Sequence, residues 1–379
     1  MPSITEITTT SLLGFSQKDL EQYVTAAGEK PYRVKQILEW IYKQRVSGIK
    51  EMLNLPAELR DKMTAEFHIN DLQHVETKGS KDTTRKFLFR LNDGRYVETV
   101  FIPASKGLNG RQSSRKTICV SSQVGCAYGC KFCASGLAGF TRNLTSAEII
   151  GQMLAVESET GETINNIVFM GMGEPLANIK NLIKALEIIT AHWGLNIGAR
   201  SVTVSTSGLA PQIRTLAEFP VPIRLAISLH GATDDVRNII MPVNKKWPIK
   251  DLFDSLHFWR LHKKQKISLE YILIQGVNDS LEQATILAKR AKGLNAKVNL
   301  IPYNTVEGLD WERPTEDVCY AFRDTVADHG INTTLRIEKG HDINAACGQL
   351  RLKKETAEGI VQAPVKIGKW TSYFNYSYI

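Results

Sequence analysis

The sequence predicts an α/β fold in which parallel strands form a partly closed barrel behind a small helical domain. From Lys116 onward, segments typical of buried strands alternate with segments of helical periodicity, and repeated βα units build parallel sheets. The chain of 379 residues is also long enough for a barrel of about 250 residues plus a smaller accessory domain. We therefore expect a partial (βα)6 barrel of the TIM-like kind.

The strands and helices of this barrel can be placed along the chain. The expected strands are residues 117–121, 166–170, 201–204, 224–227, 267–274, 297–301 and 333–337. The clearest helices between them are residues 146–157, 179–192 and 281–292. Thr145 and Glu148 form a capping-box pattern at the start of the first of these helices. Barrels of this type carry their chemistry on the loops that follow the strands.

The residues before the barrel form two smaller units. Residues 16–67 are expected to be helical, because apolar residues recur there with the spacing of one helix face, at Val34, Ile37, Leu38 and Ile41. Residues 84–91 and 95–102 alternate with a period of two around an Asp-Gly turn, which predicts a β-hairpin. The expected division is a helical accessory domain at 1–70, hairpin and linker at 71–115, the barrel at 116–350, and a C-terminal tail of unknown role at 351–379.

Composition and charge indicate a cytoplasmic protein with an anionic partner. The sequence has 43% apolar and 23% charged residues, no basic-then-apolar leader and no apolar run of membrane-spanning length. Its net charge is +8, and basic residues cluster near aromatic ones, a mixture that suits looped RNA. These clusters contain Lys30, Tyr32, Arg33, Lys35, Trp40, Tyr42, Lys43, Arg45, Arg111, Arg115, Lys116, Lys245, Lys246, Trp247, Arg351, Lys353 and Lys354. Taken alone, any one of these clusters is better explained as an ordinary solvent-exposed charged surface.

Cys126, Cys130 and Cys133 follow the first barrel strand with three and then two residues between them. Cysteine thiolates are the usual ligands of iron–sulfur clusters, and three of them leave one iron of a cubane cluster open. A structural zinc site with Cys119 as the fourth ligand is the alternative. However, Cys119 lies within the expected strand, and no second cysteine pair is present. We therefore expect one 4Fe–4S cluster with an open iron.

Polar residues follow the next three barrel strands. Gly173 and Glu174 lie in the sequence Met-Gly-Met-Gly-Glu-Pro, where glycine permits close backbone approach and the carboxylate can accept hydrogen bonds. Ser205 follows the third strand, and Ser228-Leu229-His230 follows the fourth. A histidine of this kind is, taken singly, more often a packed core residue. Successive strand ends facing one mouth favour a ligand site instead.

These motifs together resemble a known enzyme family. The cysteine triplet and the Met-Gly-Met-Gly-Glu-Pro sequence resemble the radical S-adenosylmethionine (SAM) superfamily, in which the open iron chelates SAM. Further segments are similar to the bacterial dual-specificity RNA adenine-C2 methyltransferases of the RlmN type, within the RlmN/Cfr family. They begin at Gly28, Val120, Gly139, Ile227 and Asp342, and the resemblance extends over residues 16–350.

The resemblance implies a mechanism and its residues. One SAM methylates Cys347, and a second SAM gives a radical that activates the S-methyl group for addition to adenine. Glu98 matches the base that removes the C2 proton, and Cys119 matches the cysteine that releases the product by forming a disulfide with Cys347. Without the resemblance, both cysteines are simply small buried apolar residues and Glu98 is an exposed strand carboxylate.

The resemblance also implies cofactor contacts and partners. The SAM contacts correspond to Gly173, Glu174, Ser205, Ser228, Leu229, His230 and Asn304. The implied substrates are adenosines in the peptidyl-transferase region of 23S rRNA and beside the tRNA anticodon, where a base can leave its stack at modest cost. A reductase such as flavodoxin would supply electrons, and we expect a monomer that does not bind membranes.

Two segments depart from the family pattern, and two rival functions stay open. The loop 104–114 is long for its place, and the aromatic segment 370–379 matches nothing in the family pattern. One rival is an adenine-C8 methyltransferase that confers antibiotic resistance, and the other is a non-enzymatic metal-binding RNA-binding protein. Cys319 has no expected role.

Overall fold

The computed structural model describes residues 9–81, 83–103, 114–137, 139–304, 309–336 and 348–361. Cys347, the loop 104–113 and the aromatic segment 370–379 therefore lie outside the described residues. In the described part of the chain, no helix is both long and apolar enough to cross a membrane.

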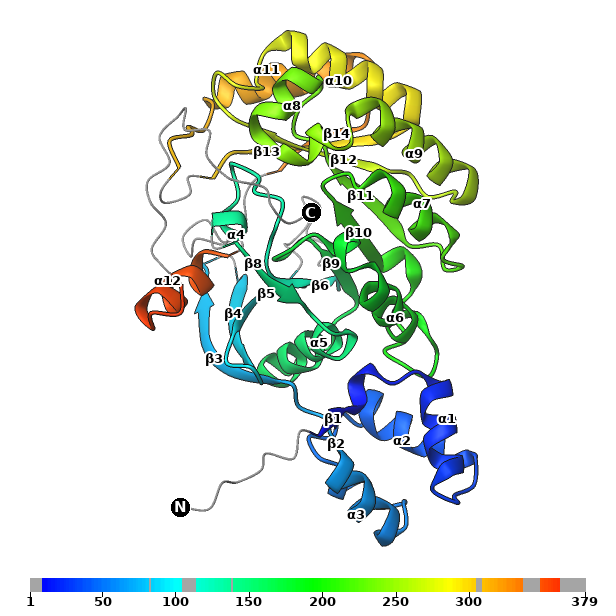
Figure 1. Ribbon diagram of the computed structural model, residues 1–379. Coiled ribbons are helices and arrows are strands. Elements are labelled where there is room, and N and C mark those ends of the chain that lie inside the picture. The colour runs from blue at the N-terminus through cyan, green and yellow to red at the C-terminus, as the bar shows by residue number, and fades with distance from the viewer. Residues whose placement is uncertain are drawn as a thin grey trace.

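Within the described residues, one mixed sheet of ten strands runs through the molecule in the order β14-β13-β12-β11-β10-β9-β6-β5-β4-β3 (Figure 1). The seven strands from β6 to β14 in this sheet are parallel: β6 Lys116–Cys119, β9 Asn166–Phe169, β10 Val202–Thr206, β11 Arg224–Ser228, β12 Ser268–Leu273, β13 Lys297–Pro302 and β14 Thr333–Leu335. Each lies within two residues of its predicted position or inside it. The two edges, β14 and β3, do not pair with each other among the described residues, so the barrel stays partial as predicted.

Helices cover the outer side of the parallel strands (Figure 1). They are α5 Ser146–Thr160, α6 Ile179–Thr190, α7 Ala210–Glu218, α8 Asp234–Ile240, α9 Ile249–His262, α10 Leu281–Leu294 and α11 Glu316–Asp328. The predicted capping box of α5 is present, since the Thr145 hydroxyl accepts from the Glu148 N–H and the Glu148 carboxylate accepts from the Thr145 N–H. Short 3-10 helices join several elements: η3 Pro175–Asn178, η4 Ala199–Ser201 and η5 Pro242–Lys245.

The predicted hairpin is part of the barrel sheet. β4 Arg85–Leu91 and β5 Tyr96–Pro103 pair antiparallel, β3 Leu72–Gly79 adds a third strand, and β5 pairs with the first barrel strand β6. Val100 lies opposite Cys119 in this pairing. The hairpin therefore holds Glu98 on the strand beside the first barrel strand.

The N-terminal residues form the expected helical unit, with α1 Gln17–Ala26, α2 Tyr32–Tyr42 and α3 Ala57–Glu66 beside η1 Leu12–Gly14, η2 Ile49–Glu51 and the short paired strands β1 Thr10–Ser11 and β2 Phe67–His68. The four apolar residues of α2 are buried as predicted, and their cluster is continuous with the barrel core. Tyr42 was grouped with the basic and aromatic residues expected to contact RNA, but this prediction is wrong. Its ring is buried and its hydroxyl donates to the Leu13 carbonyl at 3.0 Å.

A last helix, α12 Gln349–Ala357, spans the start of the predicted tail and packs against β5 and α4 (Figure 1). The Tyr96 hydroxyl of β5 hydrogen-bonds both carboxylate oxygens of Glu358, at 2.9 and 2.8 Å. Arg351 was grouped with the RNA-facing cations, but its side chain is fully buried and pairs with Glu355 at 2.8 Å. This helix therefore docks on the hairpin through polar contacts and a small buried apolar cluster that includes Leu350.

Candidate active site

A cavity of about 360 Å³ opens at the C-terminal ends of the parallel strands. It is lined by eight of the residues predicted from sequence: Cys126, Cys130, Cys133, Gly173, Glu174, Ser205, Ser228 and His230, and Asn304 lines it as well. Leu229 does not line it. The Leu229 side chain is fully buried, and its backbone donates to the Glu270 carbonyl at 3.0 Å. The sheet thus brings together nearly the whole predicted cofactor set.

The cysteine loop is held by backbone contacts between β7 Gln123–Gly125 and β8 Phe140–Asn143. The Cys126 N–H donates to the Gly139 carbonyl at 3.0 Å. Gly125 has φ +79°, and a Cβ there would lie 1.8 Å from the Gly139 oxygen, so only glycine fits. A four-residue helix, α4 Ala134–Leu137, follows the third cysteine.

The chemistry of the three thiols fits a soft, cationic group. Burial raises the pKa of Cys126 to about 12, with the neighbouring Cys133 and Glu174 adding to the shift, and burial also raises the pKa of Cys130. Such thiols bind as thiolates only beside a strong positive charge, such as cluster iron. No three His, Cys, Asp or Glu side chains in the described ranges converge on a single ion. A cubane cluster does not require that convergence, because each thiolate ligates a different iron.

Glu174 is fixed as a buried acceptor. Its Oε2 accepts from the Ser207 N–H at 2.7 Å and its Oε1 from the Leu176 N–H at 3.0 Å. Burial raises the pKa of this carboxyl, and the backbone N–H of Ser207 is the largest opposing influence. The group is therefore held in one orientation at the cavity wall.

His230 follows β11 and carries a neutral ring. Its backbone is left-handed, with φ +55°, and its Nδ1 accepts from the Ile272 N–H at 3.0 Å. Burial, and secondarily the positive charge of Arg237, lowers the pKa of His230 to about 3. The proton of the neutral ring is consequently on Nε2. The Phe132 ring, from within the cysteine motif, meets the imidazole edge-to-face at 4.8 Å between centroids.

Glu98 lies outside the cavity lining and contacts the segment that follows Cys347. Its carboxylate is 1% exposed, so the alternative in which Glu98 is an ordinary exposed strand carboxylate is wrong. Oε2 accepts from the Gly348 N–H at 2.9 Å and Oε1 from the Arg351 N–H at 2.7 Å, and the Lys86 ammonium lies 3.1 Å from Oε2. Glu98 therefore caps the start of α12, one residue beyond Cys347.

Cys119 is buried at the end of β6, and no disulfide links the five cysteines in the described part of the chain. The disulfide implied by the resemblance finds no support in these residues. Its expected partner, Cys347, is not among them. Cys319 lies on α11 and packs in the hydrophobic core.

Comparison with known proteins identifies the family. Residues 10–69 match the ribosomal RNA large subunit methyltransferase N-terminal domain, and residues 120–286 match the radical SAM superfamily. The probable dual-specificity RNA methyltransferase RlmN of Akkermansia muciniphila is 55% identical over 94% of this chain and 97% of its own. The dual-specificity RNA methyltransferase RlmN of Geotalea uraniireducens is 42% identical over 90% and 97%, respectively. The chain belongs to the RlmN family.

A solved structure supports the same conclusion for this RlmN-family chain. The crystal structure of a radical SAM methyltransferase from Sphaerobacter thermophilus is 39% identical, covers 90% of this chain and 98% of its own, and superposes with a TM-score of 0.83. These matches confirm the predicted family, fold and enzyme class, a radical SAM RNA methyltransferase. They overturn the rival of a non-enzymatic binding module. Membership of the radical SAM superfamily implies a 4Fe–4S cluster and SAM, which the thiol set and the cavity fit.

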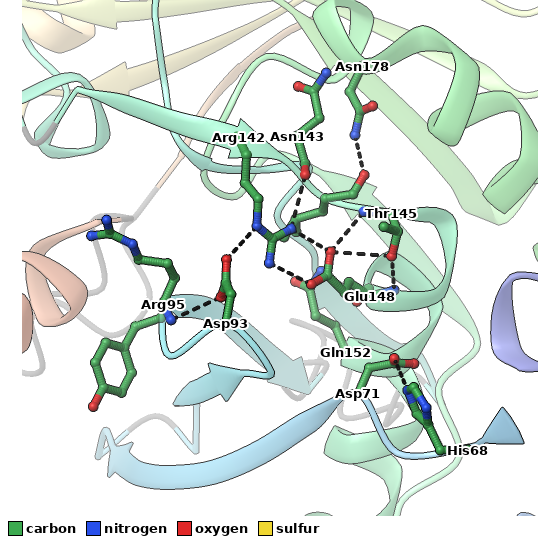
Figure 2. Close-up of polar contacts among 12 residues, drawn as sticks. His68, Asp71, Asp93, Arg95, Arg142, Asn143, Thr145, Glu148, Gln152 and Asn178 are labelled. Atoms are coloured by element: carbon green, nitrogen blue, oxygen red, sulfur yellow. Dashed lines mark hydrogen bonds and ion pairs between the residues drawn. The ribbon is translucent and has the colours of Figure 1, made fainter. Parts of the chain in front are cut away.

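Sequence reasoning missed the polar network that supports the family's cysteine loop. Figure 2 shows Arg142 between Asp93 of the hairpin turn and Glu148 of α5. The guanidinium binds Glu148 through two hydrogen bonds of 2.8 and 2.7 Å and Asp93 through one of 2.6 Å. It thereby ties β8 to the hairpin on one side and to the first barrel helix on the other.

A buried arginine behind the strand ends was also missed. Arg237 donates to the Leu229 carbonyl at 3.0 Å, to the Asn244 side chain at 2.9 Å and to the Ser207 carbonyl. Burial lowers its pKa to about 10, so it still carries its charge at neutral pH. It fixes the loops after β10 and β11, and nothing in its local sequence distinguishes it from a surface arginine.

Proposed function

We propose that this protein methylates C2 of adenosine in the peptidyl-transferase region of 23S rRNA and beside the anticodon of tRNA, and that it consumes two SAM per methyl group. The observation that carries the proposal is the contact between the Glu98 carboxylate and the N–H of Gly348. It puts the expected base beside the residue after the expected methyl carrier, Cys347. Cys119 lies on the neighbouring strand, opposite Val100.

These residues suit the chemistry that the substrate demands. Adenine C2 is an electron-poor carbon, so it does not attack the methyl group of SAM directly, and the cofactor must supply the reactive species. When bound, the cluster and SAM supply the methyl group for Cys347 and the radical that removes a hydrogen atom from it. Cys347 then carries the carbon, as a methylene radical, to C2. Glu98 accepts the C2 proton, and the unpaired electron of the adduct returns to the cluster. Attack of the Cys119 thiolate on the Cys347 sulfur forms the disulfide and breaks the carbon–sulfur bond, and the released carbon takes up a proton to become the methyl group.

In the cofactor pocket, Gly173, Glu174, Ser205, Ser228, His230 and Asn304 hold SAM, and Leu229 only positions the loop that carries Ser228 and His230. Glu174 accepts from the ligand ammonium, and the Nε2–H of His230 donates. A reductase such as flavodoxin delivers the electrons, and the protein acts as a monomer.

The N-terminal unit is the RNA-docking surface in this proposal. Lys30, Tyr32 and Lys35 are exposed on it, and the Arg33 guanidinium lies 4.8 Å from the centre of the Tyr32 ring. Exposed aromatic rings beside cations suit unpaired bases and the phosphates next to them.

The deciding experiment measures methylated nucleosides by mass spectrometry in 23S rRNA and tRNA, taken separately, from a deletion strain carrying the wild-type or a variant gene. Wild type should restore 2-methyladenosine in both RNAs. Glu98→Gln should not, whereas Glu76→Gln on β3 should match wild type. Restoration of 8-methyladenosine instead would move the protein to the C8 class and refute the proposal.

A second experiment isolates the role of Cys119. Cys119→Ala should leave the substrate RNA covalently joined to the protein, visible as a shifted band on a denaturing gel. Release of methylated RNA at the wild-type rate would show that Cys119 does not resolve the intermediate.

A further inference from the structure

The two faces of the parallel strands differ in character. Outer-face residues are buried and apolar, as Leu225 and Ile227 of β11 and Leu300 of β13 illustrate. The residues that alternate with them on the inner face along β10 to β14 are mostly polar: Thr203, Ser205, Arg224, Ser228, Ser268, Glu270, Lys297, Asn299, Thr334 and Arg336. The interior of a closed barrel is instead filled with branched apolar side chains. This inner face is therefore not a packed core.

Three inner-face positions carry a positive charge. Arg224 begins β11, Lys297 begins β13 and Arg336 directly follows β14. Glu270 is the one carboxylate at the inner-face positions of these strands. Arg115 adds a fourth cation from the other edge of the parallel set, because it precedes β6. We call Arg115, Arg224, Lys297 and Arg336 the inner-face cations.

The inner-face cations act on one another. The pKa of Arg115 is lowered by burial and then by the positive charges of Arg224 and Arg336. Burial also lowers the pKa of Lys297, and the three arginines lower it further against the opposing charge of Glu270. In the sheet, β6 is separated from β11 by β9 and β10. The curvature of the sheet therefore brings charges from both edges of the parallel set into one space.

The inner-face cations are accessible and border the cavity. Arg115, Arg224 and Arg336 are exposed, and Arg336 also lines the cavity. Among the described residues, β14 and β3 do not pair, so one side of the barrel is open, and α12 packs on β5, far along the sheet from β13 and β14. Like charges that share one space repel each other, so the group is suited to a ligand that brings negative charge.

An RNA substrate brings such charge. The chain belongs to a family of RNA methyltransferases, and an adenosine that reaches the cavity carries a phosphodiester on each side. Arginine binds two phosphate oxygens at once with its planar fork, and a lysine ammonium binds as a point charge. Contacts of this kind position a nucleic acid without reading its sequence, which suits an enzyme with two RNA substrates.

The N-terminal unit does not supply these contacts. Figure 1 shows α1, α2 and α3 at one end of the molecule and β12 to β14 towards the other. An RNA docked on the N-terminal unit therefore needs a separate cationic surface where its target nucleotide enters the barrel.

We propose that the inner-face cations bind phosphodiester groups of the substrate RNA next to the target adenosine. The inference rests on the proposed function, because it assumes that the adenosine of an RNA enters this cavity. It adds a phosphate-binding surface inside the barrel to the docking surface on the N-terminal unit. Of its four residues, sequence analysis grouped only Arg115 with the RNA-facing cations.

Fluorescence anisotropy on the cluster-loaded protein, under anaerobic conditions, tests the assignment. The probe is a labelled RNA stem-loop with one adenosine in its loop, and its affinity is measured over a series of KCl concentrations. A second RNA carries uncharged methylphosphonates at the two linkages that flank the adenosine. The proteins are wild type, Arg224→Gln, Lys297→Gln, their double variant, and the matched control Lys289→Gln, exposed on α10 of the outer layer.

Wild type should bind the neutralised RNA about tenfold more weakly than the parent RNA. Each single variant should bind the parent about tenfold more weakly, and the slope of log K against log salt should flatten by about 0.7, the value for one phosphate contact to a single strand. The double variant should no longer prefer the charged linkages. Lys289→Gln should behave as wild type. Circular dichroism checks the fold of each variant, and Lys297→Arg, which keeps the charge, should keep the wild-type slope.

Two results would overturn the assignment. If Arg224→Gln and Lys297→Gln keep the wild-type slope, these side chains do not contact phosphates. If the neutralised linkages weaken binding to wild type and to the double variant by one common factor, the contacted phosphates lie elsewhere. Failure of wild type to form 2-methyladenosine in the parent RNA, with SAM and a reductant present, would instead refute the proposed function, and the binding data would still decide whether the inner-face cations contact RNA.

Discussion

Replacing Lys86 with methionine should destabilise the protein, because it leaves the Glu98 carboxylate buried without its cation. Both side chains are 1% exposed, and their charged atoms lie 3.1 Å apart. Removing one partner of a buried ion pair costs about 3–5 kcal/mol. Glu98 keeps two backbone N–H donors in the variant, which favours the lower end, about 3 kcal/mol. With an unfolding entropy of about 2.1 cal/mol/K per residue, this corresponds to a fall of about 4 °C in Tm.

Differential scanning fluorimetry measures this fall against Lys35→Met, the same substitution at an exposed lysine of α2. The control should change Tm by less than about 1 °C. The double variant Lys86→Met/Glu98→Gln should be more stable than Lys86→Met alone, since the amide leaves no uncompensated charge in the interior. Equal Tm values for Lys86→Met and Lys35→Met, or no recovery in the double variant, would refute the reasoning.

Three further outcomes are expected. Gly125→Ala should lower the iron and sulfide content of the reconstituted protein, because the new Cβ collides with the Gly139 carbonyl, whereas Gly161→Ala, with open space around a similar positive φ, should keep full content. Gly348 has φ +93°, and a Cβ there would lie 2.7 Å from a backbone nitrogen of α4, so Gly348→Ala should displace the start of α12. The variant should form 2-methyladenosine about 100-fold more slowly, while its affinity for S-adenosylhomocysteine should not change. Finally, the native pKa of His230, about 3, lies below the unfolded value of 6.5, so acidification protonates the unfolded chain first. The free energy of unfolding measured in urea should thus fall between pH 7 and pH 5 by about 2 kcal/mol more in wild type than in His230→Asn, and an equal fall in both would contradict the low pKa.

Much of the site followed from local sequence because it is built from loops at strand ends. Once the βα alternation predicts a parallel sheet, the residues after β6, β9, β10 and β11 must meet at one edge. Arg224, Lys297 and Arg336 were missed because they lie at the ends of different strands, where each is only a charged residue beside apolar ones. Their importance depends on the curvature that brings them together, and only the packed structure shows that.

The environment of Glu98 shows the same limit. The alternation of the hairpin placed this residue on one face of a strand, and the resemblance assigned it a role. Neither revealed that Lys86 and the start of α12 enclose its carboxylate, since these groups come from parts of the chain 12 and 250 residues away. Tyr42 and Arg351 failed as RNA contacts for a related reason, because burial is a property of packing and not of residue type.

The sequence by itself determined the barrel, the helical unit before it, the cysteine triplet and the family. Each of these depends on spacing or on short motifs, which the chain carries locally. The tertiary structure alone decided that the hairpin extends the barrel sheet, that α12 docks on it through Glu98, and that cations from separate strands meet on the inner face of the barrel. Those features depend on contacts between distant segments, and their energies come from burial and from hydrogen-bond partners that only folding brings together.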